Sequence, residues 1–68
     1  MTYIGEARKI SSHLRRQTLF TELSISPGRF VWIMVYSDKA KTIIVGRVTV
    51  PKDGPIRVEG DPALDTFL

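Results

Sequence analysis

Few side chains in this 68-residue sequence could carry out nucleophilic or acid–base chemistry. His13 is the single histidine, and no residue three or four positions away could share a metal ion with it on a helix. Serines that could act as nucleophiles have no suitably spaced base to activate them: Ser11, Ser12, Ser24 and Ser26. Cysteine is absent, and the five glycines are dispersed rather than gathered in a phosphate-binding loop. We therefore expect a protein without enzymatic activity, bound metal, cofactor or small-molecule substrate.

Basic residues form the most conspicuous chemical pattern. Residues 1–58 hold all ten Lys and Arg with four acids, whereas residues 59–68 hold three acids and no base. Four bases lie within residues 8–16: Arg8, Lys9, Arg15 and Arg16. Clustered bases are typical of nucleic-acid-binding surfaces, but net charge also keeps small proteins soluble. Both interpretations remain open at this point.

A helix over residues 4–17 would gather these four bases on one surface. At about 100° per residue, Ala7, Ile10 and Leu14 fall on one side, and the bases fall on the other within roughly 120°. Gly5 and the pair Ser11-Ser12 lower the helix propensity of this segment. The spacing nevertheless predicts an amphipathic helix whose apolar side packs on the rest of the chain.

Residues 18–59 have the pattern of an antiparallel sheet. Apolar and β-branched runs predict strands at 18–25, 29–36, 42–50 and 56–59. Pro27 and Gly28 suit a type II turn between the first two strands, and residues 38–41 suit a four-residue hairpin loop. Asp61-Pro62 predicts the start of a short C-terminal helical turn, after which Phe67 and Leu68 would return to the core. The predicted fold is α+β, an N-terminal amphipathic helix packed on a four-stranded antiparallel β-meander.

The predicted sheet has two apolar faces. With residues 38–41 as the loop, Trp32 would lie opposite Arg47 and form a cation–π pair. One face would be aromatic, and its members are Phe30, Trp32, Met34, Tyr36, Ile43, Val45, Arg47 and Thr49. The aliphatic face would comprise Val31, Ile33, Val35, Ile44, Gly46, Val48 and Val50. Because one helix covers only one face, we expect either the C-terminal turn or a second copy of the chain to cover the other.

The aromatic run could serve as an interface or as a binding surface. The alternation Phe30, Trp32, Met34, Tyr36 resembles the aromatic strand of RNA-recognition sheets, in which rings stack on bases. Val31 stands where that pattern has glycine or alanine, and the βαββαβ element order is absent. Packing in the core or in a dimer interface is the competing interpretation. The expected interface residues are Phe30, Trp32, Met34 and Tyr36.

Two functional hypotheses follow from these surfaces. The first is a small nucleic-acid-binding or regulatory protein that acts as a homodimer. Its nucleic-acid-binding residues would be Arg8, Lys9, Arg15, Arg16, Arg29 and Arg47, in contact with DNA or RNA. The alternative is a protein-binding accessory factor or inhibitor, of the kind phages and mobile elements encode, that uses the aromatic face. Length predicts one domain spanning residues 1–68. No apolar run approaches the ~18 residues of a membrane span, and the N-terminus lacks a secretory pattern, so we expect a cytoplasmic protein.

Overall fold

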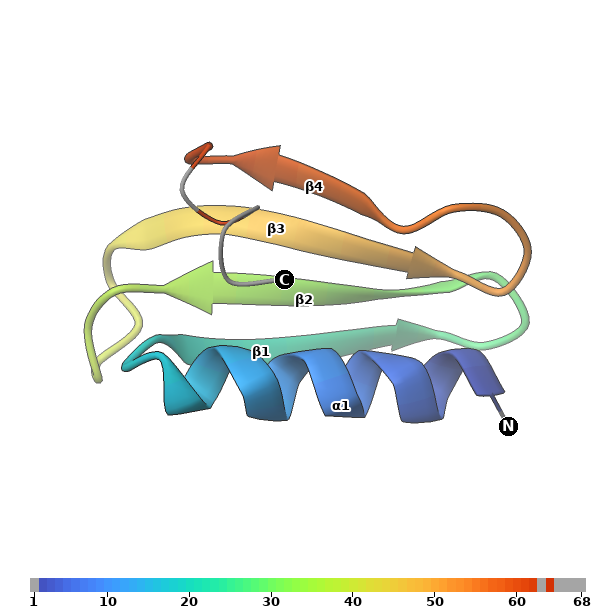
Figure 1. Cartoon of the computed structure of the whole chain (residues 1–68), viewed down its shortest axis with the longest axis horizontal. Coiled ribbons are helices and arrows are strands. Elements are labelled where there is room, and N and C mark those ends of the chain that lie inside the picture. The colour runs from blue at the N-terminus through green and yellow to red at the C-terminus, as the bar shows by residue number, and fades with distance from the viewer. Residues whose placement is uncertain (1, 63, 65–68) are drawn as a thin grey trace.

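One helix packs on one face of a four-stranded antiparallel sheet in the computed structural model, which describes residues 2–62 and 64 (Figure 1). The elements are α1 (Thr2–Arg16), β1 (Phe20–Ser26), β2 (Phe30–Tyr36), β3 (Ile44–Pro51) and β4 (Arg57–Gly60). The strands lie side by side in chain order. The predicted α+β meander is therefore confirmed, with each element within about two residues of its expected position. The predicted C-terminal helical turn is not shown as an element, although the N–H of Leu64 donates to the carbonyl of Asp61 at 3.0 Å. Phe67 and Leu68 lie outside the described residues.

Helix α1 buries the apolar side that its periodicity predicts. Tyr3, Ala7 and Leu14 are buried against the sheet, and Ile10 packs beside them. The hydroxyl of Ser11 is also buried and hydrogen-bonds to the hydroxyl of Thr21. This bond satisfies a polar group that would otherwise cost free energy in the core. Ser11 therefore has a packing role despite its low helix propensity.

The aliphatic face of the sheet supplies the rest of the core. Val31, Ile33 and Val35 of β2 are fully buried, as is Val48 of β3. Leu64, which follows β4, is 1% exposed and closes the core over the β3–β4 side. It packs where Gly46 and Gly60 pair across the two strands. A Cβ atom on Gly46 would overlap Leu64 Cδ1 and the carbonyl oxygen of Glu59, so this position requires glycine.

The turn between β1 and β2 forms as its sequence predicts. Gly28 has a φ of 76°, and the N–H of Arg29 donates to the carbonyl of Ser26 at 3.0 Å. The N–H of Gly28 donates to the hydroxyl of Tyr3 at 2.8 Å. This bond joins the start of α1 to the end of the β1–β2 hairpin.

The predicted pairing of β2 with β3 is wrong by two residues. Trp32 lies opposite Thr49, and Met34 lies opposite Arg47. The connection between β2 and β3 is longer than the predicted residues 38–41. The Asp38 carboxylate accepts hydrogen bonds from the N–H groups of Thr42 and Ile43, each at 2.9 Å. These bonds keep both residues in the loop, so β3 begins only at Ile44.

A shift of two residues leaves most side chains on their expected face, since strand side chains alternate with period two. The exception lies at the start of β3. Val35 pairs with Gly46 and Tyr36 with Ile44, so Val45 is an extra residue between the two pairs. Ile44 therefore lies opposite Tyr36 on the aromatic face, where it is 56% exposed, and not on the aliphatic face as expected.

Candidate functional site

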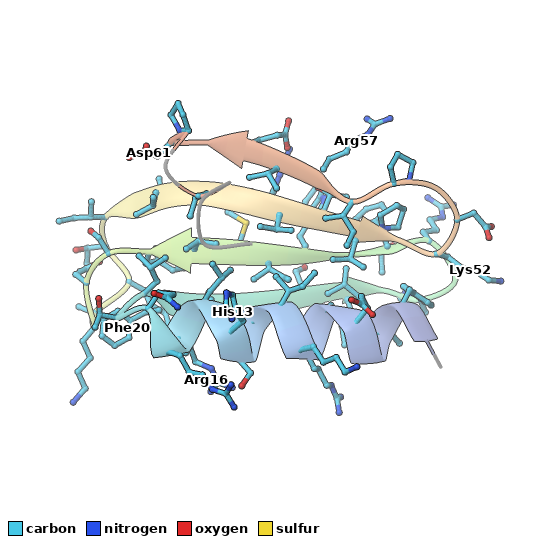
Figure 2. The ribbon with its side chains drawn as sticks, in the orientation of Figure 1. His13, Arg16, Phe20, Lys52, Arg57 and Asp61 are labelled. Carbon is cyan, nitrogen blue, oxygen red and sulfur yellow. The ribbon has the colours of Figure 1, made fainter. Side chains whose placement is uncertain are left out.

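Four bases share the outer surface of α1, which we call the basic helix face: Arg8, Lys9, Arg15 and Arg16. All four are exposed, because the opposite side of the helix carries Tyr3, Ala7 and Leu14 into the core. Figure 2 shows Arg16 projecting from α1 away from the sheet. The structure therefore brings together the four helix bases that the sequence predicts to be neighbours.

No described acid forms an ion pair with the basic helix face, and the one acid on α1 is Glu6, three residues before Lys9. Among the described residues, an ion pair joins Arg47 to Glu59 on the sheet, far from the helix surface. Arg15 and Arg16 lie in the last turn with His13, where cations interact favourably with the helix dipole. The stability of the helix therefore partly explains why positions 15 and 16 are basic. Arg8 and Lys9 lie in the middle of the helix and have no such explanation. Their charges remain available to an external anion.

The second surface is the side of the sheet opposite α1, which we call the open face. No element among residues 2–62 and 64 covers it. Its apolar members are Phe20, Phe30, Trp32, Met34, Tyr36, Ile44 and Pro51. Most of these side chains are half-buried by one another, and Phe30 stacks on Trp32 with ring centroids 5.0 Å apart. An apolar surface of this kind is typical of an interface.

Arg47 lies at the centre of the open face. Its guanidinium carbon is 4.5 Å from the centroid of a Trp32 ring, which confirms the predicted cation–π contact. The contact is diagonal, since the two residues are not directly opposite one another. Arg47 also donates to Oε1 of Glu59 on β4 through Nε, at 3.0 Å, and through Nη2. The charge of Arg47 is therefore already balanced within the chain.

A shallow hollow of about 320 Å³ lies on the open face beside this ion pair. Its lining includes Met34, Ile44, Arg47 and Glu59, together with Val45, Gly46 and Gly60. It is wide open to solvent and contains one acid and one base. The hollow therefore suits a projecting side chain of another protein better than an enclosed small molecule.

The six predicted nucleic-acid-binding bases do not form one surface. Arg29 lies in the β1–β2 turn, and Arg47 lies on the open face, on the opposite side of the sheet from α1. Only the four helix bases remain as a continuous cluster. The expected interface residues Phe30, Trp32, Met34 and Tyr36 do lie together on the open face.

The sequence-based prediction omitted several residues of the open face, among them Phe20, Ile44, Arg57 and Glu59. Phe20 belongs to an alternating run, so its place follows from the period of two. Arg57 and Glu59 could be assigned to this face only from the pairing of β3 with β4.

The described residues offer little support for other classes of site. They contain no group of three or more His, Cys, Asp or Glu side chains that could hold a metal ion. Among them there is also no helix long and apolar enough to cross a membrane. Comparisons with protein-family models, curated proteins and solved structures found no match to this chain.

Proposed function

We propose that this chain is a small, non-enzymatic regulatory protein that binds DNA or RNA through the basic helix face. The observation that supports the proposal is the exposure of Arg8, Lys9, Arg15 and Arg16 on one side of α1, without an ion-pair partner among the described residues. Such bases contact phosphate groups and release counterions, which drives binding without reading sequence. We therefore expect an affinity that depends strongly on salt and weakly on base sequence.

The shape of the basic helix face also suits a phosphate backbone. Arg8 and Arg15 form one row and Lys9 and Arg16 a second, and the members of each row are about 10 Å apart along the helix. Gly5 and Ser12 lie between the rows, so no bulky side chain separates them. Nothing lies within 4 Å of the place a Cβ atom would take on Gly5, so the fold itself does not require glycine there. Glycine inside a helix costs roughly 0.5–1 kcal/mol, and close approach of a ligand would explain why it is present.

The test is the double substitution Arg15→Ala with Arg16→Ala, assayed by titration against labelled duplex DNA and single-stranded RNA over a range of salt concentrations. We expect weaker binding to every sequence, and a slope of log affinity against log salt that is smaller by about two for the duplex. The matched control is Lys39→Ala with Lys52→Ala, which removes the same charge from two exposed loop residues. The control should change the slope much less. Circular dichroism and thermal melting should show that both variants fold.

Two outcomes would contradict the proposal. The first is a wild-type protein that binds neither nucleic acid at ~50 mM salt, where counterion release favours binding most. The second is an equal loss of affinity in the helix variant and the loop control, which would indicate an effect of net charge alone.

A second candidate function is supported by the open face. Phe30, Trp32 and Tyr36 remain partly exposed there beside Arg47, and aromatic and arginine side chains are the usual anchors of protein interfaces. The same surface would serve a homodimer, which we propose as the functional form, or a different protein partner. Retention on heparin together with a dimeric mass would favour the first function. A monomer that heparin does not retain would favour capture of a partner protein.

A further inference from the structure

Side chains on the open face form four rows across the strands. From one end of the sheet to the other, the rows are Phe20–Tyr36–Ile44, Glu22–Met34–Arg47–Glu59, Ser24–Trp32–Thr49–Arg57 and Ser26–Phe30–Pro51. The two inner rows span all four strands. Each inner row ends on β4 with a charged residue, Glu59 in one and Arg57 in the other.

This order of rows is self-complementary. Consider two sheets stacked through their open faces and related by a two-fold axis that lies between them and runs perpendicular to the strands. The axis places each strand on its own copy and exchanges the inner rows with each other and the outer rows with each other. Met34 then lies on Trp32 of the partner subunit, and Tyr36 lies on Phe30 of the partner subunit. Aromatic and thioether side chains pack favourably in such pairs.

Charges on β4 are matched by the same operation, which places Arg57 on Glu59 of the partner subunit at two symmetric positions. Both Arg47 bonds go to Oε1 of Glu59, so Oε2 accepts no hydrogen bond from another described residue. The open hollow of about 320 Å³ lies directly beside this carboxylate and has room for an incoming guanidinium group. Stacked sheets usually cross at about 30°. This crossing displaces β4 of one subunit from β4 of the other by about half the distance between neighbouring rows, and an arginine side chain can span that displacement.

The other simple arrangement is less favourable. A two-fold axis parallel to the strands would place β1 on β4 of the second copy within the same row. Glu22 would then lie on Glu59 of the partner subunit, and two like charges would be brought together.

The area of the open face is sufficient for a small dimer. The 26 residues of the four strands, with about 4.8 Å between strands and about 3.3 Å per residue, cover roughly 410 Å² in plan. Side-chain relief raises the accessible area toward the ~600 Å² per subunit found at the lower limit of stable interfaces. Aromatic residues and methionine, which make up most of the apolar members of this face, are enriched at the centres of such interfaces.

We infer that a second copy of this chain covers the open face, with the two-fold axis perpendicular to the strands, and that Arg57 of each subunit binds Glu59 of the other. The inference gives a register to the homodimer proposed above and does not depend on nucleic-acid binding. Both helices lie on the outside of this dimer, so both basic helix faces stay accessible.

Charge reversal tests the register, with dimerisation measured by sedimentation equilibrium in the absence of nucleic acid. In the Arg57→Glu homodimer, two acids meet at both symmetric positions, and in the Glu59→Arg homodimer two bases meet. We expect each variant alone to raise the dimer Kd about tenfold or more. In an equimolar mixture, the heterodimer has opposite charges at both positions, so the mixture should dimerise within about threefold of the wild type.

The control is Arg8→Glu on the basic helix face, which should leave the dimer Kd unchanged. Both test positions are exposed, so circular dichroism should show native folding for each variant. A wild-type monomer at 100 µM would overturn the homodimer itself and leave the open face to another protein. A wild-type dimer with variants that the mixture does not restore would overturn only the register.

Discussion

Among the described residues outside α1 and the central strands, Leu64 is the one whose truncation to alanine should destabilise this protein most. The side chain is 1% exposed and its Cδ1 atom fills the space above Gly46. Gly46 and Gly60 have no side chains that could move into the vacated volume. A cavity that neighbouring side chains do not fill keeps its full energetic cost. We therefore expect the free energy of unfolding to fall by about 3 kcal/mol, within the ~2–5 kcal/mol range of Leu→Ala substitutions.

Such a loss is large for a domain of this size. Total stability at roughly 0.05–0.15 kcal/mol per residue amounts to about 3–10 kcal/mol for 68 residues. We expect the thermal midpoint to fall by about 15 °C, since 1 kcal/mol corresponds to roughly 4–8 °C in domains this small. Urea titration followed by Trp32 fluorescence, with the protein held at one concentration, would measure the change.

Ile43→Ala is the matched control, because it also shortens a branched aliphatic side chain, but at a position 59% exposed. We expect it to change the free energy of unfolding by less than about 0.5 kcal/mol. If Leu64→Ala stays within 1 kcal/mol of the wild type, Leu64 does not close the core, and the account of the glycine pair is wrong.

Three further predictions concern the turns and the open face. Gly28→Ala should lower stability by about 1–2 kcal/mol in a thermal melt, because the φ of 76° disfavours a side chain; an unchanged melt would contradict this. Hydrogen bonds from the Thr42 hydroxyl and the backbone N–H of Ile43 hold the pKa of Asp38 below its usual value. The stabilisation they provide is present at neutral pH and is lost as the pH falls below about 4, so the wild type and Asp38→Asn should converge in stability toward pH 2. Trp32→Glu should fold but sediment as a monomer, since its side chain lies on the open face; a dimeric variant would exclude this surface as the interface.

Local periodicity in the sequence by itself determines the elements and most of their faces. The spacing of Ala7, Ile10 and Leu14 is enough to place the four bases on the outside of a helix. Alternation with period two is enough to separate Phe30 and Trp32 from Val31 and its aliphatic neighbours, even though the predicted register is wrong by two residues. These properties depend on geometry within one element, so one sequence suffices to predict them.

Only the tertiary structure decided which residues from different elements lie on the same surface. The register of β2 with β3 depends on how the Asp38 carboxylate shapes the loop, and the pairing of Arg47 with Glu59 depends on the position of β4. The place of Leu64 in the core depends on two glycines that meet only after both strands have paired. Because α1 and the open face lie on opposite sides of the sheet, the helix bases and Arg47 belong to separate surfaces. Each of these features joins residues from different elements, and local sequence patterns carry no information about such distances.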